Sequence, residues 1–470
     1  MALSPHDDLI RLYGKLKRRA GVAEVWSNYY NGDVPLKFAS PEFKGQTGSL
    51  FDDFSDNWCQ VVPDATVERL VPIAFRLNDG TIDSRAWDAW RRNEADVEVG
   101  LAFLEALIAG RSFGLVWKPD GINTEITFHD VRQAIVDYVP GKRRVRRAGL
   151  ILWRDGGQER ASLFYPDSVY LWVREASNPF GYGVDAGSGW VSAGILPNPL
   201  KVVPLVALEN RARLRGKPTS EISSVAPLQD SVNTLWAHLM TAADERAVPA
   251  RAVLGMDRPT KDLLDADGEV IGEEDLPIDR FRRDRLLWLE REGASIAEFS
   301  AADLTNYTSV IETAVRHIAA QTRTPPSYLT GEMVNISADA LVASEAGLVA
   351  KVQERQRYFG ASLRELMRLE ALASGDPVRA EALSMGSVVW RDAQFRSEAQ
   401  YADALTKYKA INVPDEALWE RMPDTTPEEI ERWKSMRDDQ AAAIVGGNIA
   451  GLFGAKPDEV PADDPAAIAQ

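Results

Sequence analysis

AVRHIAAQTRTPPSYLTGEMVNISADALVASEAGLVA, residues 314–350, predicts a helix, an abrupt stop, a short polar loop and then a very long second helix. The stop lies at Pro325 and Pro326, because proline lacks a backbone N–H and collides with the preceding helical turn. The next helix begins only after the short polar loop that follows this stop.

The two helices can be read outward from this stop. The first covers residues 303–323, with Asp303 as its N-cap, and its apolar residues share one face: Leu304, Tyr307, Ile311, Val315 and Ile318. The second begins near Ser337 and runs without proline to about Ser374. Its apolar line is Leu341, Leu348, Val352, Phe359, Leu363 and Leu366. At 1.5 Å per residue this helix is about 50 Å long, which is enough to cross a whole domain or a subunit ring.

The composition indicates a large, ordered protein. With 470 residues, 45% of them hydrophobic and 26% charged, the chain can bury a sizeable core and is expected to form roughly three domains. Its single cysteine, Cys59, excludes an intramolecular disulfide and is predicted to be a buried thiol. One cysteine and four scattered histidines provide no zinc site.

Charge and hydropathy exclude further classes. The formal net charge of −16 argues against a protein that grips DNA tightly, although it suits a smooth channel in which gripping phosphates would be a fault. The N-terminus lacks the features of a signal peptide, and the longest apolar runs, such as residues 248–254, are too short to span a bilayer. We therefore expect a soluble intracellular protein without a membrane partner.

The remaining elements follow from periodicity and turn residues. Helices are predicted over residues 4–31, 50–70, 83–109 (as a pair) and 223–246. Strands are predicted over residues 113–117, 125–128, 134–138, 148–153, 162–165, 168–173 and 387–391. Residues 177–199, rich in Gly, Pro and Asn, are expected to be a long surface loop. Helical pieces continue to residue 434, and the chain end is expected to be a flexible tail.

The short matches to catalytic and binding motifs are mostly better interpreted as structural features, such as turns, than as functional sites. Residues 110–114 match G-x-S-x-G, but a helix precedes Ser112 and a strand follows it, the reverse of a nucleophile elbow. Residues 265–269 (DADGE) place glycine too early for an EF-hand loop and are read as an acidic turn. No nucleotide-binding P-loop is present. The basic run 142–147 is read as a solvated hairpin turn in preference to a DNA contact.

Several strings, in order along the chain, resemble portal proteins of tailed bacteriophages, in the actinophage-type, SPP1-like branch. They are residues 37–43, 57–59, 109–113, 198–199, 221–222, 227–230, 320–326, 337–341 and 390–392. The resemblance covers residues 12–434 and rests on shared order rather than on any single string. It implies an α+β portal fold with an α/β wing, a two-helix stem, a small mixed α/β clip, a long wing helix and a small α-helical crown.

The resemblance also implies domain boundaries. They are the wing at 1–222, a stem helix at 223–247, the clip at 248–299, a second stem helix at 300–324, the tunnel loop at 325–337, the long helix and rest of the wing at 338–396, the crown at 397–440 and a flexible tail at 441–470. The small mixed segment that interrupts a helical pair at 248–299 is where a clip is expected.

The implied function is structural. Portals of this kind form a dodecameric ring at one capsid vertex, nucleate procapsid assembly, and pass double-stranded DNA through the channel without sequence preference during packaging and ejection. The implied partners are the terminase large subunit, head-completion (adaptor) proteins, and the major capsid and scaffolding proteins. The implied location is the virion, after assembly in the host cytoplasm. No catalytic residue, cofactor or metal site is expected.

The resemblance assigns candidate site residues. The tunnel loop would present Gly331, Glu332, Met333, Val334, Asn335, Ile336 and Ser337 to DNA. Arg316 and Arg323 are candidate basic residues of the lumen. Candidates for terminase docking at the clip are Asp262, Glu273, Glu274 and Arg282.

Two other functional classes compete with a channel. A DNA-processing enzyme would need a carboxylate cluster for metal or a nucleotide-binding loop, and the sequence offers neither. A capsid-associated structural protein without a channel would form no large closed ring.

Overall fold

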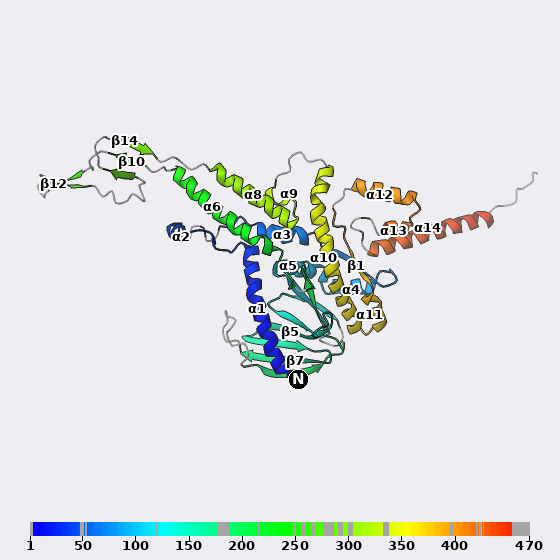
Figure 1. The fold of residues 1–470 in the computed structure, drawn as a ribbon. Helices are drawn as coiled ribbons and strands as arrows, with labels where there is room; N and C mark the ends of the chain where they lie inside the picture. The colour runs from blue at the N-terminus through cyan, green and yellow to red at the C-terminus, as the bar shows by residue number, and fades with distance from the viewer. Residues whose placement is uncertain are drawn as a thin grey trace, which may run out of the picture.

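The computed structural model describes residues 3–47, 51, 54–118, 121, 123–175, 189–214, 216–247, 251–254, 260–264, 269–275, 286–289, 295–298, 304–331, 338–394, 398–419, 422, 425 and 427–453. Within them the chain forms a mixed architecture of helices and mostly antiparallel sheets (Figure 1). The helices are α1 (Pro5–Asn31), α2 (Pro41–Thr47), α3 (Trp58–Val67), α4 (Ser84–Arg92), α5 (Ala95–Ala109), the short 3-10 helix η1 (Ile222–Ser224), α6 (Ala226–Ala247), α8 (Thr305–Thr322), α9 (Pro326–Thr330), α10 (Ala338–Ala373), α11 (Pro377–Ser384), α12 (Glu398–Ala410), α13 (Asp415–Trp419) and α14 (Pro427–Phe453).

The strands form five separate sheets in the described part of the chain. They are β1 (Pro72–Arg76), β2 (Arg111–Trp117), β3 (Glu125–His129), β4 (Ala134–Tyr138), β5 (Arg146–Asp155), β6 (Gln158–Phe164), β7 (Ser168–Glu175), β8 (Val191–Pro197), β9 (Leu205–Glu209), β10 (Arg251–Leu254), β11 (Thr260–Leu264), β12 (Val270–Asp275), β13 (Leu286–Leu289), β14 (Ser295–Glu298) and β15 (Ser387–Trp390). The largest sheet is an antiparallel meander in the order β4-β5-β6-β7-β8. The others have the orders β3-β2-β9, β13-β10-β14, β11-β12 and β1-β15.

Helix α1 begins and ends at strong capping signals and covers one face of the large sheet. The Ser4 side chain accepts a hydrogen bond from the Asp7 backbone N–H at 3.2 Å, and Pro5 occupies the first helical position. Gly32 ends the helix at φ 84°, a left-handed conformation that costs glycine little. The buried contact is made by Leu9, Leu12, Tyr13 and Leu16 of the helix with Ile135, Leu150 and Leu163 of the sheet.

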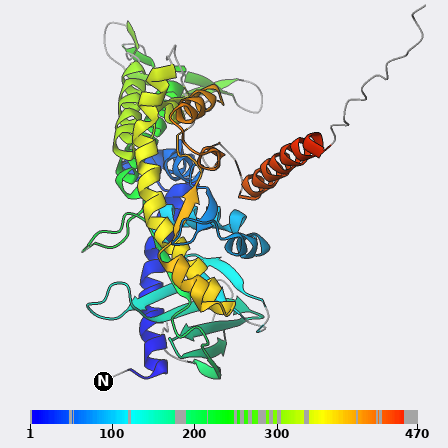
Figure 2. The ribbon, with the colours of Figure 1, turned by 90° about the vertical axis from the view of Figure 1, so that its right-hand side faces the viewer.

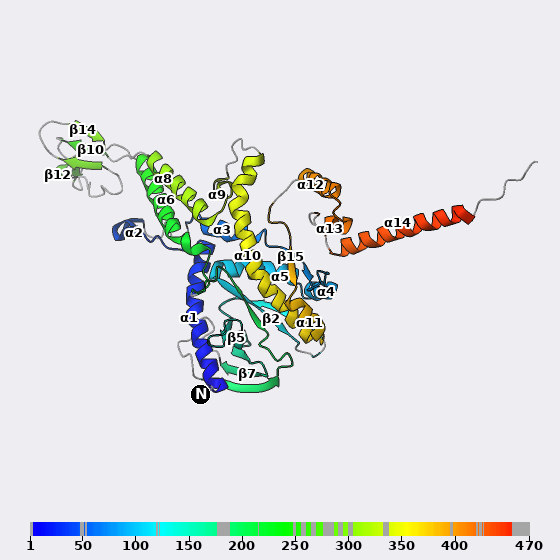
Figure 3. The same ribbon diagram turned by 45° about the vertical axis from the view of Figure 1, so that its right-hand side comes forward.

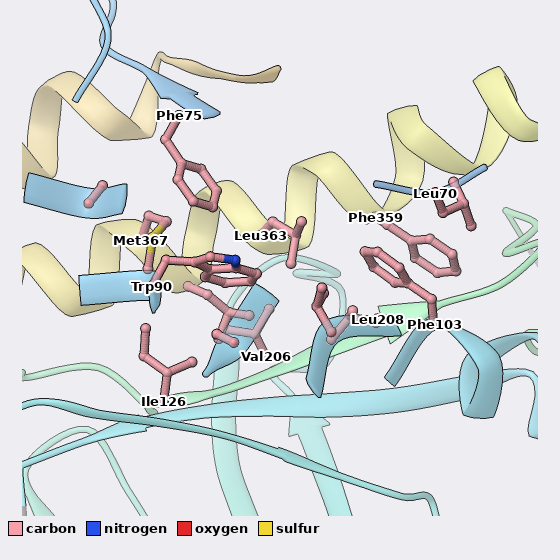
Figure 4. Packing of buried hydrophobic residues seen from close by; sticks show 14 of the residues in the cluster. Leu70, Phe75, Trp90, Phe103, Ile126, Val206, Leu208, Phe359, Leu363 and Met367 are labelled. Carbon is pink, nitrogen blue, oxygen red and sulfur yellow. The ribbon is translucent and has the colours of Figure 1, made fainter. Parts of the chain in front are cut away.

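The largest buried cluster lies where α10 passes α4, α5 and the strands around them (Figure 4). Phe359 of α10 stacks on Phe103 of α5, with ring centroids 4.8 Å apart. Trp90 of α4 is fully buried and meets Phe75 edge-on at 5.3 Å, with Leu363 in the same cluster. Burying one such large apolar side chain stabilises the fold by about 1.5–3 kcal/mol, so α10 is held mainly by its apolar line.

A second buried cluster joins α8 to α6, η1, α3 and the end of α1. It includes Ile311, Val315 and Ile318 of α8, Val225 and Val232 near the start of α6, Trp58, Cys59 and Val62 of α3, and Tyr29 of α1. Helices α6 and α8 lie side by side and point away from the rest of the chain toward β10, β12 and β14 (Figures 1 and 3). At the C-terminal end, α14 extends away from the body in a perpendicular view (Figure 2).

The structure confirms most elements predicted from periodicity. The long helix is 36 residues, Ala338–Ala373, and every described residue of its predicted apolar line is fully buried. The six strands predicted between residues 113 and 173 and the strand near residue 387 are all present. Among the described residues of the helix predicted over 50–70, only those of α3 are helical, while β1, β9 and α11 were not predicted at all. Among the described residues no helix is long and apolar enough to cross a membrane.

Three loop or tail predictions were wrong in part. Residues 177–199 are not entirely a surface loop, because Val191–Pro197 pair with β7 as the edge strand β8. This strand was not predicted because glycine and proline, which are typical of loops, occur close to its apolar residues. Pro326 starts the short helix α9 inside the predicted tunnel loop. Proline ends the preceding helix α8, but it is well suited to the first position of a new helix. Helix α14 continues to Phe453, past the predicted start of the tail at residue 441, because no proline interrupts that alanine-rich stretch.

The basic run 142–147 is only partly a solvated hairpin turn. Its last two residues begin β5, and Arg147 forms ion pairs with Asp8 at 2.6 Å and Asp137 at 2.9 Å. Arg146 pairs with Glu365 of α10 at 2.5 Å. The run therefore ties the large sheet to α1 and α10, since charged residues at a partly buried strand end need paired carboxylates.

Candidate functional site

Helix α8 has one buried face and one exposed, mostly uncharged face. Ile311, Val315 and Ile318 are buried at helical spacing. The exposed residues are Thr305, Asn306, Thr308, Ser309, Val310, Glu312, Thr313, Arg316, His317, Ala320 and Gln321. Hydroxyl and amide groups dominate this surface, so it can contact a polar partner without a strong local charge.

The two predicted lumen residues, Arg316 and Arg323, are both exposed. Arg316 lies within α8, whereas Arg323 is the residue that ends the helix. Arg316 donates to Glu312 at 3.2 Å, and the guanidinium of Arg323 lies 3.9 Å from the carboxylate of Glu354. Each cation therefore has a carboxylate nearby, which moderates the positive potential on this side of α8.

A buried lysine from α10 closes the C-terminal end of α8. Nζ of Lys351 donates to the backbone carbonyl of Thr322 at 3.0 Å, one of the carbonyls that a helix end leaves without an internal partner. Burial lowers the pKa of Lys351 to about 8; Glu221 opposes this shift and Arg355 adds to it. The next residue, Arg323, takes a left-handed φ of 55°, so the chain turns sharply there.

Glu221 and Arg355 form a buried ion pair beside Lys351. Two guanidinium nitrogens of Arg355 donate to Oε1 of Glu221, at 2.6 and 3.1 Å, and both side chains are only 3% exposed. Burial opposes ionisation of Glu221, yet Arg355 and Lys351 hold its pKa below the usual value. This pair connects the start of α6 to the middle of α10, and charges this deeply buried depend on each other for compensation.

Arg69, just after α3, contacts the segments on either side of residues 332–337. Its guanidinium donates to the Tyr328 hydroxyl of α9 at 3.0 Å and to both carboxylate oxygens of Glu345 of α10 at 3.1 and 3.2 Å. It also donates to the backbone carbonyl of Ala393 at 3.1 Å. We call Arg69, Tyr328, Glu345 and Ala393 the Arg69 group. The planar fork of arginine suits a two-oxygen contact of this kind.

Helix α9 is held from a second direction by α3. The indole Nε1 of Trp58 donates to the backbone carbonyl of Leu329 at 3.1 Å. Gly331 then ends α9 at φ 68°, with its N–H donating to the Ser327 carbonyl at 3.1 Å. Of the predicted tunnel-loop residues only Gly331 is described; Glu332, Met333, Val334, Asn335, Ile336 and Ser337 lie outside the described residues.

The predicted docking residues fall on the hairpin β11–β12. Asp262 and Glu273 are both exposed and face each other directly across the two strands. Like charges in this position repel, and Oε2 of Glu273 accepts a hydrogen bond from the Thr260 hydroxyl at 3.0 Å. Glu274 lies next along β12, opposite Lys261, and Arg282 lies outside the described residues. The hairpin thus presents two exposed carboxylates opposite each other.

The described residues bring together no catalytic constellation. No group of three or more His, Cys, Asp or Glu side chains could hold a metal ion within the part of the chain that was described. Ser112 is buried and its hydroxyl donates to the Ala102 carbonyl at 2.6 Å, as expected for a helix-to-strand turn that follows Gly110. Burial raises the pKa of the Cys59 thiol to about 12, which leaves it unreactive.

The sequence analysis missed the contacts that hold the α8–α10 junction, by which we mean residues 322–331. One signal was present: at 100° per residue, Arg355 lies within about 20° of Leu348 and about 40° of Phe359, on the buried line of α10. A charged residue in the middle of an apolar line indicates a buried partner. Nothing in the local sequence of Arg69 distinguishes it from a surface arginine, because its partners come from other segments.

Comparison with solved structures finds distant likenesses. The chain superposes on a chain from the neck of an empty GTA particle with a TM-score of 0.44 and 15% identity, covering 84% of this chain and 97% of that one. A chain from the virion of the native gene transfer agent (GTA) particle gives a TM-score of 0.40 and 13% identity, covering 86% and 99%. These scores are too low to assign a fold.

Sequence comparison is far more specific. The portal protein of Mycobacterium phage L5 is 30% identical over 417 residues, covering 84% of this chain and 80% of that protein. The portal protein of Mycobacterium phage D29 is 29% identical over 415 residues, covering 84% and 81%. The sequence model of the family described as phage portal protein, SPP1 Gp6-like, matches residues 14–443. The chain therefore belongs to the SPP1 Gp6-like family of phage portal proteins.

Proposed function

We propose that this protein forms a dodecameric ring at one capsid vertex, through which double-stranded DNA is packaged and later ejected. The observation that carries the proposal is the family match over residues 14–443, which takes in both helices of the α6–α8 pair, the strands between them and α10. The protein would also nucleate procapsid assembly and would have no catalytic activity of its own. It would act in the virion after assembly in the host cytoplasm.

In this proposal each part of the chain has a place in the ring. Residues 1–222 and 338–396 form the wing, α6 and α8 are the stem helices, and residues 248–299 form the clip. Residues 325–337, which begin with α9, form the tunnel loop, and the helices after residue 397 form the crown. The projection of α6 and α8 away from the rest of the chain supports the stem and clip assignments.

A channel needs a lining that does not hold DNA. Twelve copies at −16 amount to −192 formal charges, so the ring as a whole repels phosphate. The exposed face of α8 offers mainly hydroxyl and amide groups, and its cation Arg316 has Glu312 at 3.2 Å. Weak polar contacts of this kind let a duplex slide, whereas each strong contact between a phosphate and an unpaired cation adds affinity and salt dependence. Arg316 and Arg323 would touch the passing backbone.

The clip hairpin is the proposed docking site for the terminase large subunit and, later, for head-completion proteins. Asp262 and Glu273 repel each other across the strands, and a basic partner surface would relieve that repulsion. Changing both to lysine is expected to weaken terminase binding at least tenfold in a pull-down or interferometry assay. Changing Glu312 of α8 to lysine is the matched control. If the hairpin variant bound terminase as tightly as the wild type, the docking site would have to lie elsewhere on the protein.

The decisive test is the mass and shape of the purified particle. Twelve copies of 51.9 kDa amount to about 623 kDa, a mass that native mass spectrometry resolves. Electron micrographs of the same sample should contain rings with an axial hole. A monomer or dimer at micromolar concentration, with no larger species even beside capsid and scaffolding proteins, would contradict the proposal.

The tunnel loop can be tested separately from assembly. Deleting Glu332 to Ile336 is expected to leave the ring mass unchanged and to lower the DNA packaged per particle in a reconstituted assay. Failure of the deletion variant to form rings would instead assign this segment a structural role.

A further inference from the structure

Two basic segments of the chain, residues 139–147 and 211–220, meet in the folded protein. The first is the turn between β4 and β5 together with the start of β5, and the second follows β9 and leads to η1. Their sequences contain nine lysine and arginine residues and neither aspartate nor glutamate, in a chain whose net charge is −16. A local reversal of charge of this kind indicates a surface that meets an anion.

Arg143 joins the two segments. Its guanidinium donates to the backbone carbonyl of Arg213 at 2.8 Å and to that of Leu214 at 3.4 Å. These acceptors lie 70 and 71 positions further along the chain. Because both acceptors are neutral carbonyl groups, the contact holds the segments together without cancelling the charge of Arg143.

Each segment is also held by its own backbone. In the first, the Val139 N–H donates to the Val145 carbonyl at 2.9 Å, and the Val145 N–H donates to the Lys142 carbonyl at 3.1 Å. In the second, Nδ2 of Asn210 donates to the Thr219 carbonyl at 2.9 Å, and the Thr219 N–H donates back to the Asn210 carbonyl at 3.2 Å. Side chains presented from a backbone fixed in this way lose less conformational freedom when a partner binds.

The cations furthest from the paired ends of the two segments are exposed to solvent. Those that the structure describes are Lys142, Arg143, Arg144, Arg211, Arg213 and Lys217. Two of them already have a structural contact, since Arg143 joins the segments and Nη1 of Arg211 lies 3.9 Å from Oε2 of Glu221. The other four are accessible to a partner from outside the chain. We call Lys142, Arg144, Arg213 and Lys217 the basic patch.

The composition of this surface favours nucleic acid over protein as its partner. Six exposed cations accompany two exposed apolar side chains, Val145 at 48% and Leu214 at 92%. The centre of a protein–protein interface is depleted in charged residues, whereas protein–DNA interfaces are much more positively charged. Each exposed cation can neutralise one phosphate, and the counterions that this releases supply affinity without any contact to a base.

We propose that the basic patch binds the phosphate backbone of double-stranded DNA without sequence preference. The patch is carried by the turn after β4 and the loop after β9, and none of it belongs to α8 or to the clip hairpin. This binding therefore does not depend on the proposed channel. The acidic remainder of the chain repels phosphate, so the affinity is weak and depends strongly on salt.

The test uses the full-length protein in its native assembly and a short fluorescein-labelled DNA duplex. Binding is followed by fluorescence anisotropy from low to physiological potassium chloride concentration. The logarithm of the association constant should fall linearly with the logarithm of the salt concentration, by about 0.9 for each phosphate contact. The pair variants Lys142→Gln with Arg144→Gln, and Arg213→Gln with Lys217→Gln, should each weaken binding about tenfold at low salt and reduce this slope by about two.

The matched control is Arg91→Gln with Arg92→Gln. It removes two exposed cations from α4 and changes the net charge by the same amount as either pair variant. It should alter the affinity less than about twofold, because salt screens charges that lie away from the duplex. Assembly mass and melting temperature are measured for every variant, and where one pair variant does not assemble, the other carries the test.

Four results would overturn the proposal. The first is an absence of duplex binding at low salt. The second is binding that neither pair variant weakens, which places the duplex elsewhere on the protein. The third is equal weakening by the control, which indicates only an effect of net charge. The fourth is a polyglutamate peptide that binds more tightly than the duplex and loses affinity in the same pair variants, which would assign the patch to an acidic protein.

Discussion

Helices α8 and α10 flank the same short connection, yet they are held in opposite ways. Helix α10 is buried along its apolar line and carries the buried charges Lys351 and Arg355. Helix α8 is buried on one side only and exposes a nearly uncharged polar face on the other. We infer that α10 is anchored in the core and holds the α8–α10 junction in place. The exposed face of α8 is accessible for contacts with another molecule.

The largest expected effect comes from the core side of α10. Phe359→Ala removes a fully buried ring stacked on Phe103 and is expected to lower the free energy of unfolding by about 4 kcal/mol. The matched change on α8, Val310→Ala, removes a side chain that is 52% exposed and should cost less than about 0.5 kcal/mol. Urea denaturation of both variants checks this. If the two variants lost similar amounts of unfolding free energy, the proposed difference between the two helices would be wrong.

Breaking the buried ion pair should cost nearly as much. Glu221→Gln removes the buried carboxylate that pairs with Arg355 and leaves it only the partly exposed Glu354 at 3.1 Å, so we expect a loss of about 3 kcal/mol in the same assay. The double change Glu221→Gln, Arg355→Met should cost less than the single change, because the buried guanidinium is then gone and Lys351 is the one cation left beside residue 221 from this group of three. A double variant weaker than the single one would mean that packing, and not charge, dominates at this site.

Lys351 predicts a pH dependence with a definite sign. Its pKa of about 8 in the folded protein lies below 10.5, so between these values the unfolded state binds the proton more tightly. Stability contributed by this group should therefore rise with pH across that window, by about 2–3 kcal/mol in total. The measurement is the free energy of unfolding of the wild type minus that of Lys351→Met at pH 7.5 and pH 10. Subtraction removes the other titrating groups, and a flat or falling difference would contradict the assignment.

A smaller effect is expected at the Arg69 group. Arg69→Lys keeps the charge but loses the planar fork that reaches Tyr328 and Glu345 together, so it should cost about 1–2 kcal/mol. Amide hydrogen exchange in α9 should become faster, while exchange in the middle of α10 should not change. Arg91→Lys, on an exposed part of α4, is the control. Uniformly faster exchange would mean that Arg69 supports the whole fold and not this junction.

The smallest effect on stability is expected on the outer face of α8. Arg316→Gln removes an exposed pair with Glu312 and should change the free energy of unfolding by less than about 0.5 kcal/mol. Packaging measured at increasing salt is the sensitive readout, because a contact with phosphate adds to the salt dependence of DNA binding. A large loss of stability would mean that Arg316, like Arg355, stabilises the fold.

The sequence predicted the elements whose signals are local. Residues 134–138 were predicted as a strand with the observed boundaries of β4, and the start and end of α10 agree within two residues. Strand β8 was missed because its uncharged residues stand beside a stretch rich in glycine and proline. Arg355 was missed as a site residue because its partner, Glu221, is 134 positions away and nothing in a single sequence pairs them.

By itself the sequence determined the family, the long helix and the proline stop, because each depends on residue order and short-range periodicity. It also set the acidic charge, which is additive and independent of the fold. Only the tertiary structure decided that Arg69 contacts both sides of residues 332–337, that Lys351 closes α8 and that Arg143 joins two basic segments. Such contacts join segments far apart in the chain, and their existence depends on how helices and sheets pack.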